Sequence, residues 1–500
     1  MPLLLILLML VSCLPLPWPE RPDGVAPLGC LLVVIGLMAV SILTTMMVAT
    51  RFTNRLARHS ERRTEIIRSY VKFQRRIPWL TLGLWIVAVV PGGWAFTVRE
   101  QAASDWLGRD PLLWPAAELL VPLPYFLALL ANWSSRFRLD RALYLSSDKV
   151  TRGEAPAEFW SLPGYVLFQA RTLLLYLGLP MGLCVTQQTL SRIAPEFSAS
   201  DSAAWMTFLG SFGTLIVFPW LVPRFLGLSR MLPGPHRTEF EAASRRLGIR
   251  FAQFYVWPTR GQMINAMVLG IVPQLRYVIF TDRLLDELTV EERLAVFGHE
   301  AGHARHHHLP YYVLFLVLSG IVVGAATLGM NALIPWPTRW VEWSGLLSLP
   351  VLGVYFFVVF GWLSRRCERQ ADVFGCRVGS CRNPECVDHD EDTTLGGRDS
   401  LCRTGIRSMI QALDRVGDLT GSGAAPQSRR AKVWALVRAW QHGSMHSRIE
   451  FLQRMLDDPT LAAKADRHAF RTRLGLALGL TGFAVAFGFI YGWAALLKLL

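Results

Sequence analysis

Long apolar segments recur along the 500-residue chain, and they constrain its fold more than any other feature. A helix needs about 20 mainly apolar residues to cross the hydrocarbon core of a bilayer. About nine segments approach or reach that length, at residues 3–18, 26–49, 79–97, 112–133, 162–187, 204–228, 309–335, 344–363 and 474–497. We therefore expect a mainly α-helical, polytopic membrane protein with about nine transmembrane helices.

The first of these segments, residues 3–18, has two possible interpretations. It is short and is interrupted by Pro15 and Pro17, so a signal peptide is one of them. A signal peptide begins with a positively charged region, and no Lys or Arg precedes this segment. We therefore favour a short first span.

The charge distribution indicates a membrane surface as the partner. The chain has 51 basic and 37 acidic side chains, a net charge of +14. In a soluble protein this balance would suggest nucleic acid. Here the basic residues gather between spans, at residues 51–76 and 134–161, as the positive-inside rule describes for cytoplasmic loops. We expect contact with the lipid bilayer and none with nucleic acid. We also expect a bacterial inner (plasma) membrane location.

Two longer polar stretches, residues 236–308 and 364–473, follow the first six spans and lie on the cytoplasmic side by alternation. The first stretch contains three short apolar runs that predict strands, at Arg250–Val256, Asn265–Leu269 and Tyr277–Thr281. We therefore expect a small α+β domain at the cytoplasmic face. The predicted layout is a multi-span domain at 1–230, the α+β domain at 231–460 with two spans inside it, and a linker with the last span at 461–500.

Residues His299–His303 read His-Glu-Ala-Gly-His. On a helix, residues four apart share a face, so both imidazoles can reach one metal ion with Glu300 beside them. Thr289 and Glu292 stand at the spacing of a capping box, which predicts where this helix begins. The motif is short, so two solvated histidines near a membrane surface remain the alternative.

A second helical face with metal-binding potential follows the span at 344–363. Glu368 and Asp372 are four residues apart, so Glu368 can supply a third metal ligand. Asp372 can accept a hydrogen bond from the outer nitrogen of a ligand histidine. The alternative is an ordinary surface helix of mixed charge. Placement favours the metal site, because both half-sites stand at the cytoplasmic ends of one predicted helical hairpin.

Four motifs of the chain together resemble a known family. They are Asn265-Ala266-Met267 with Thr281-Asp282 and Thr289-x-Glu291-Glu292, then His299–His303, then Ser364-Arg365-x-x-Glu368-x-x-Ala371-Asp372, and finally His442-x-Ser444-x-x-x-Arg448-Ile449. Their order and the two spans between them are similar to those of the HtpX and CAAX prenyl endopeptidase family of integral-membrane zinc metallopeptidases. The resemblance covers about residues 236–455.

The resemblance implies a zincin-type metallopeptidase domain with one catalytic zinc ion. It implies that His299, His303 and Glu368 bind the zinc. It also implies that Glu300 acts as general base on a zinc-bound water, and that Asp372 supports a ligand histidine from behind. The protein would then be a zinc metalloendopeptidase that hydrolyses peptide bonds of membrane-associated or misfolded proteins. A catalytically silent membrane scaffold that retains the fold is the alternative, and a transporter rests on span count alone.

The resemblance also implies residues that hold substrate. His442 and Arg448 would face the cleft and help to hold the substrate or the developing oxyanion. An edge strand would pair with an extended substrate through Asn265, Ala266 and Met267. Two departures concern the last motif. Gly443 replaces the usual proline, which predicts a looser loop, and His446 is a second candidate for the role of His442.

A group of cysteines offers a further possible metal site. Cys376, Cys381, Cys386 and Cys402 lie in one polar stretch together with His389. They contain no CxxC pair, so a structural zinc site is only an alternative. Free thiols are the expected state in a reducing cytoplasm.

Overall fold

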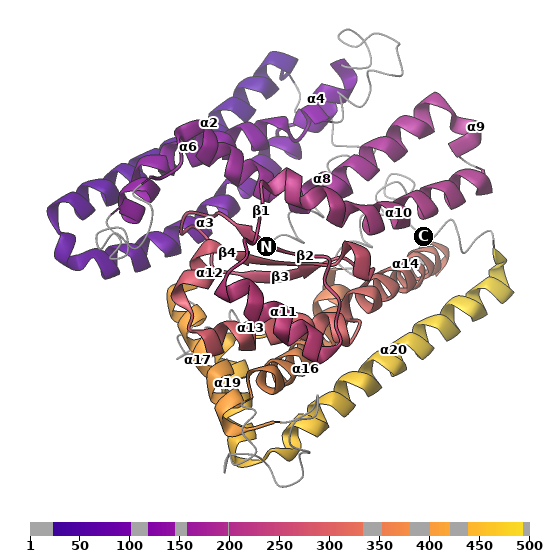
Figure 1. Cartoon of the computed structure of the whole chain (residues 1–500). Helices are drawn as coiled ribbons and strands as arrows, with labels where there is room; N and C mark the ends of the chain where they lie inside the picture. The colour runs from indigo at the N-terminus through magenta and orange to yellow at the C-terminus, as the bar shows by residue number, and fades with distance from the viewer. Residues whose placement is uncertain are drawn as a thin grey trace. The chain divides into compact units, whose positions relative to one another are not determined.

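The computed structural model describes residues 24–101, 119–145, 158–198, 200–333, 353–380, 401–420 and 439–493 (Figure 1). Internal contacts divide the chain into two units, Met1–Ala203 and Ala204–Leu500, which are described separately. The predicted first span at residues 3–18 lies outside the described residues.

The first unit is built from helices that bury apolar faces against one another. Its elements are α2 (Pro27–Arg58), η1 (Ser60–Arg62), α3 (Arg63–Val89), α4 (Trp94–Gln101), α6 (Leu123–Leu145), α8 (Leu162–Ile193) and α9 (Pro195–Ser198). Helix α2 packs against both α3 and α6. Between them the Asn132 amide donates hydrogen bonds to the hydroxyl oxygens of Ser41 (3.1 Å) and Thr81 (3.2 Å). Such bonds between helices stabilise polar groups in an apolar interior.

A four-stranded sheet forms the core of the second unit. Its strands are β1 (Ser229–Arg230), β2 (Gln253–Trp257), β3 (Ala266–Leu269) and β4 (Tyr277–Thr281), in the order β1-β2-β4-β3. Strands β2 and β4 are parallel, while β1 and β3 pair antiparallel with their neighbours. Every residue of β4 is buried, as expected for a central strand of Tyr, Val, Ile, Phe and Thr. Strand β3 is therefore an edge of the sheet.

The three predicted strands are all present, with shifted ends in two cases. Tyr277–Thr281 matches β4 residue for residue, while the strand predicted at Arg250–Val256 begins only at Gln253. The strand predicted at Asn265–Leu269 is β3 without its first residue. The two-residue strand β1 was not predicted, because so short a strand carries no alternation.

The remaining elements of the second unit are helical. They are α10 (Asp201–Leu226), α11 (Pro235–Leu247), η4 (Pro273–Leu275), α12 (Asp282–Glu287), α13 (Val290–Arg305), α14 (His308–Leu333), the π-helical turn η5 (Phe356–Phe360), α16 (Gly361–Gly379), α17 (Arg403–Thr420), α19 (Met445–Asp457) and α20 (Thr460–Tyr491). Helices α11 and α13 lie on the same side of the sheet (Figure 1). There Phe240 of α11 and Phe297 of α13 pack against Phe254 and Phe280 of the strands.

Glycines let α13 and α16 approach closely. A side chain at Gly298 of α13 would place its Cβ 2.6 Å from Cβ of Val378 on α16. A side chain at Gly375 of α16 would place its Cβ 2.8 Å from the carbonyl oxygen of Ala295 on α13. Real Cβ atoms do not approach that closely. The small residues therefore fix the separation of the two helices that carry the predicted metal ligands.

The helices of the described residues support an integral membrane protein. Four described helices are long and apolar enough to cross a membrane, at Pro27–Arg58, Leu162–Ser191, His308–Ala326 and Thr460–Tyr491. Two bent pairs raise the number to six if each is one span, at Glu65–Val89 with Trp94–Glu100 and at Trp205–Thr214 with Ile216–Leu226. The prediction of about nine spans is not confirmed. The predicted spans at 112–133 and 344–363 lie partly outside the described residues.

Candidate active site

Helix α13 carries the His-Glu-Ala-Gly-His motif and begins where the sequence predicts. The hydroxyl of Thr289 accepts a hydrogen bond from the backbone N–H of Glu292 (3.3 Å). The carboxylate of Glu292 accepts one from the backbone N–H of Thr289 (2.8 Å). This capping box satisfies two donors that a helix start leaves unpaired. His299 and His303 then follow one turn apart on the same face.

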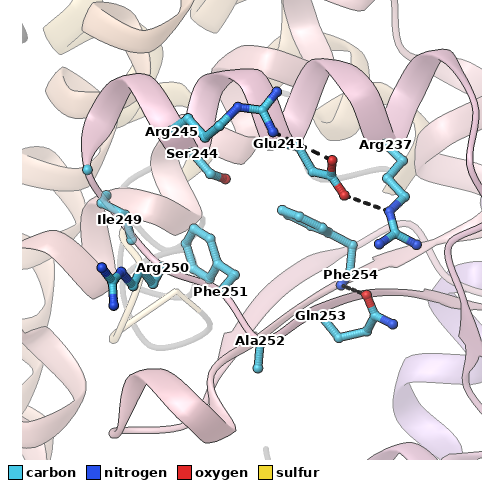
Figure 2. A pocket seen from close by; sticks show the side chains of 11 residues that line it. Arg237, Glu241, Ser244, Arg245, Ile249, Arg250, Phe251, Ala252, Gln253 and Phe254 are labelled. Atoms are coloured by element: carbon cyan, nitrogen blue, oxygen red, sulfur yellow. Dashed lines mark hydrogen bonds and ion pairs between the residues drawn. The ribbon is translucent and has the colours of Figure 1, made fainter.

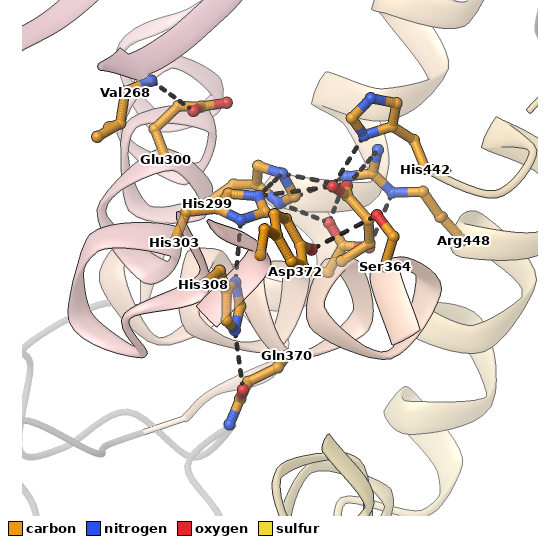
Figure 3. Close-up of polar contacts among 12 residues, drawn as sticks. Val268, His299, Glu300, His303, His308, Ser364, Gln370, Asp372, His442 and Arg448 are labelled. Carbon is orange, nitrogen blue, oxygen red and sulfur yellow. Dashed lines mark hydrogen bonds and ion pairs between the residues drawn. The ribbon is translucent and has the colours of Figure 1, made fainter. Parts of the chain in front are cut away.

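Three side chains from α13 and α16 converge, and two of them, His299 and His303, are labelled in Figure 3. The Nε2 atom of His299 lies 3.2 Å from Nε2 of His303 and 3.5 Å from Oε2 of Glu368. The Nε2 atom of His303 lies 3.6 Å from Oε1 of Glu368. One ligand atom from each residue lies within 4.8 Å of the other two. The structure thus brings together the three predicted metal ligands.

Asp372 and Arg448 support this group from behind. The Nδ1 atom of His299 lies 2.9 Å from Oδ1 of Asp372. The guanidinium of Arg448 donates two hydrogen bonds to the Asp372 carboxylate, one of them from Nε at 2.9 Å. Another nitrogen of Arg448 lies 3.6 Å from Oε2 of Glu368. Asp372 is fully buried and Arg448 is 8% exposed, so the pair neutralises two charges away from water.

The electrostatics of the cluster favour binding of a cation. Burial lowers the pKa of His299, but hydrogen bonds to Asp372 and Glu368 outweigh burial and raise it to about 10. Burial lowers the pKa of His303 to about 4. Burial raises the pKa of Glu368, but the hydrogen bonds of His299 and His442 hold it well below its usual value. The cluster therefore binds a proton at His299, which a metal cation would displace.

The donor set fits a zinc ion. Catalytic zinc sites use three protein ligands, drawn from imidazole nitrogens and carboxylate oxygens. The Oε2 atom of Glu368 is buried and has only long polar contacts, 3.5 Å to His299 and 3.6 Å to Arg448, so it can still take a closer partner such as a cation. The Nδ1 atom of His299 faces Asp372, which leaves Nε2 to face the other two ligands. The His299, His303 and Glu368 group is therefore compatible with zinc.

Glu300 lies beside the edge strand of the sheet. Its Oε2 atom accepts a hydrogen bond of 3.0 Å from the backbone N–H of Val268 on β3 (Figure 3). Burial raises the pKa of this carboxyl to about 7. A group with a pKa near 7 exchanges protons readily near neutral pH, as a general acid or base must.

The strand predicted to bind substrate, β3, pairs with β4 along one edge and with no strand of the described sheet along its other edge. The backbone N–H of Asn265 donates to the Thr281 hydroxyl (3.0 Å), and its carbonyl accepts from the Thr281 N–H (3.0 Å). Backbone groups of a strand alternate in direction, so those of Ala266 and Val268 face the free edge while those of Met267 face β4. Of the three residues named from the sequence, only Ala266 therefore faces the outer edge; Val268 lies within the predicted strand Asn265–Leu269 but was not singled out. The two-residue period, counted from Asn265, could have located it.

His442 lies at the open side of the cluster. Its Nδ1 atom lies 2.8 Å from Oε1 of Glu368, and its side chain is 67% exposed. The other candidate, His446, is exposed on α19. The contact with Glu368 is therefore made by the histidine that the motif resemblance implies.

Gly443 gives the turn that carries His442 a backbone path closed to proline. Its φ is 72°, and its N–H donates a hydrogen bond of 2.7 Å to the carbonyl of Ala439. Proline fixes φ near −65° and has no N–H. Arg365 of α16 donates a further hydrogen bond of 2.7 Å to the carbonyl of Trp440. Gly443 thus gives the turn a left-handed backbone conformation that proline cannot adopt. The looser loop expected from the sequence stays a prediction.

A separate hollow of about 620 Å³ lies along α11 and β2 (Figure 2). On its rim Arg237 forms an ion pair of 2.7 Å with Glu241, one helical turn away. The lining runs from Arg237 to Phe254 and contains none of the residues of the metal cluster. The hollow is therefore distinct from the candidate active site.

The cysteine site was predicted only as an alternative, and most of it lies outside the described residues. Cys376 and Cys402 are both buried. Cys381, Cys386 and His389 are not among the described residues. The possibility of a structural zinc there stays a prediction.

A match to a protein-family model agrees with the motif resemblance. Residues 236–387 match the model of Peptidase family M48, a stretch that includes strands β2, β3 and β4 and helices α13 and α16. The crystal structure of S. mikatae Ste24p superposes with a TM-score of 0.48 at 13% sequence identity, over 84% of this chain and 97% of that one. No curated protein sequence matches the chain. The resemblance to the HtpX and CAAX prenyl endopeptidase group is confirmed by the M48 match.

Proposed function

From the premise that residues 236–387 form a Peptidase family M48 domain, we propose that this protein is a zinc-dependent membrane endopeptidase. Its substrates are peptide bonds of membrane-associated or misfolded proteins. The observation that carries this proposal is the convergence of His299, His303 and Glu368 beside a general-base candidate, Glu300, and an edge strand.

The chain's own residues divide the work of peptide hydrolysis. When bound, a zinc ion would supply Lewis-acid polarisation of the attacking water and of the scissile carbonyl. Glu300 accepts the proton of the attacking water and returns it to the leaving amine. Its pKa of about 7 suits both directions of transfer. Asp372 holds His299 in one tautomer through its Nδ1 atom, and Arg448 holds Asp372.

The substrate is held as an added strand in this proposal. The backbone groups of Ala266 and Val268 point away from β4, so an extended peptide can pair with them. The N–H of Val268 donates to Glu300, and the peptide would compete for that donor next to the base. His442, which is exposed and in contact with Glu368, is placed to donate a hydrogen bond to the carbonyl oxygen of the peptide. Arg448 would act mainly through Asp372 and Glu368.

The membrane determines which proteins reach this site. Helix α14 begins at His308, five residues after the ligand His303, and its residues His308–Ala326 are apolar enough to cross a bilayer. The cluster therefore stands close to a membrane surface, which favours membrane-associated substrates. We further propose that this surface is the cytoplasmic face of a bacterial inner membrane, because basic residues cluster at 51–76 and 134–161 on the same predicted side.

The test compares membrane proteomes of cells that carry the wild type or Glu300→Gln. The variant keeps the three metal ligands and the shape of the glutamate, so only proton transfer is lost. Full-length substrate proteins should accumulate in cells with the variant. Fragments that are present with the wild type and absent with the variant should identify these substrates. Identical proteomes would contradict the peptidase and favour a catalytically silent scaffold.

A further inference from the structure

A buried hydrogen-bond chain leads away from the back of His303. The turn after α13 contains His307 in a left-handed conformation (φ 53°), and α14 begins at the next residue. This sharp turn brings His308 back beneath His303, where its ring is fully buried. The Nδ1 atoms of the two rings lie 2.9 Å apart. The Nε2 atom of His308 lies 3.1 Å from Oε1 of Gln370 on α16 (Figure 3).

The orientation of the Gln370 amide is determined by helix α20. Asp466 is ion-paired with Arg377 (2.8 Å), so its carboxylate can only accept hydrogen bonds. It accepts one of 3.1 Å from the amide nitrogen of Gln370. Arg473 can only donate, and it donates one of 3.2 Å to the amide oxygen. The amide oxygen of Gln370 therefore faces His308 as an acceptor.

This orientation fixes the protons along the chain. An amide oxygen accepts, so the Nε2 atom of His308 must carry the proton that it shares with Gln370. A neutral imidazole that donates from Nε2 accepts at Nδ1. The Nδ1 atom of His308 therefore accepts a hydrogen bond from the Nδ1–H of His303. The lone pair of His303 is left on Nε2, the atom that faces His299 and Glu368.

Arg473 also holds the turn that positions His308. Its guanidinium donates a hydrogen bond to the carbonyl of His306, at the carboxyl end of α13. The hydroxyl of Tyr311 donates in turn to the carbonyl of Arg473. A cation at a helix carboxyl end satisfies carbonyls that the helix leaves unpaired. Helix α20, which lies outside residues 236–387, thus contacts both the turn and the amide that orient His303.

We propose that His308, Gln370, Asp466 and Arg473 are positioning residues that fix His303 in its metal-binding tautomer. Helix α20, through Asp466 and Arg473, thereby helps to orient a ligand of the metal site. This inference rests on the zinc site of the proposed function. It adds to that site the residues that keep the proton of the ligand His303 on Nδ1. Removal of such outer hydrogen bonds typically weakens metal binding about 10–100-fold.

The test measures the zinc affinity of the purified full-length protein by competition with a chelator, together with the visible spectrum of the Co²⁺-loaded protein. Gln370→Met keeps the length of the side chain but removes the acceptor, so zinc binding should weaken about 10–100-fold and the Co²⁺ spectrum should change. The double variant Gln370→Glu with Asp466→Asn exchanges the polar groups and keeps an acceptor toward His308. It should restore wild-type affinity and spectrum. Arg467→Gln, at an exposed position on α20, is the matched control and should change neither.

Two results would overturn the inference while leaving the proposed function intact. One is unchanged zinc affinity and spectrum in Gln370→Met, when the wild type binds zinc. The other is an equal loss of zinc affinity in Gln370→Met and in the double variant. That result would indicate a packing defect and not a change in the tautomer of His303. A wild-type protein that binds no zinc would instead overturn the proposed function itself.

Discussion

Replacement of Gly298 by alanine should separate α13 from α16. The new Cβ would lie 2.6 Å from Cβ of Val378 and 3.0 Å from Cα of Gly375. Neither obstacle is the end of a flexible side chain, so one helix must move. Overpacking of this kind costs about 1–3 kcal/mol. Alanine improves helix propensity over glycine by about 1 kcal/mol. We therefore expect a net loss of stability of up to about 2 kcal/mol.

The same displacement should weaken zinc binding, because His299 directly follows Gly298 and Glu368 lies on the opposing helix. Urea unfolding in detergent micelles and zinc affinity by chelator competition measure the two effects. Gly479→Ala is the matched control, since a Cβ there meets nothing within 4 Å. It should be neutral or stabilising and should leave zinc binding unchanged. If Gly298→Ala matched this control in both measurements, close approach through glycine would not be what sets the ligand geometry.

Three further predictions concern the charges around the metal cluster. Arg448→Met should leave the buried Asp372 carboxylate with His299 as its remaining partner and cost up to about 3–5 kcal/mol, measured by unfolding; a change under about 1 kcal/mol would contradict the buried pair. His442→Gln should lower peptide turnover while His446→Gln should not, and equal effects in a cleavage assay would refute the assignment of His442. In zinc-free protein the folded state binds a proton at Glu300 up to a pH of about 7, above the ordinary pKa of 4.5, so the contribution of Glu300 to the unfolding free energy should fall as pH rises between these values. The unfolding free energy of the wild type minus that of Glu300→Gln should therefore fall across that pH range when both are measured with a chelator present, and a constant difference would contradict the raised pKa.

The metal ligands could be predicted because each half-site lies within one helical turn. His299 and His303 are four residues apart, as are Glu368 and Asp372, so helix geometry alone places each pair on one face. The capping box at Thr289 fixed the start of α13 in the same local way. What the sequence could not supply was the distance between the two helices. That distance depends on Gly298 of α13 and Gly375 of α16, which let the two helices pack closely. A pattern within one helix cannot predict which residues of another helix it will contact.

Other features escaped prediction because they depend on backbone groups or on distant residues. The Val268 N–H that meets Glu300 is a backbone donor, so no residue type marks it. The contacts of Gln370 join residues about a hundred positions apart, and a lone glutamine in a helix gives no signal. The prediction of about nine spans stays unconfirmed, because the segments at 3–18, 112–133 and 344–363 lie wholly or partly outside the described residues.

The most direct test of the account is to measure zinc per chain and peptide cleavage in one preparation of the wild type and of Glu300→Gln. The substrate is an unfolded membrane protein. The account predicts about one zinc per chain in both proteins, because His299, His303 and Glu368 remain. It predicts that cleavage falls by at least about 10²–10⁴-fold in the variant, the usual contribution of a general base. Cleavage at the wild-type rate by zinc-loaded Glu300→Gln would contradict the account.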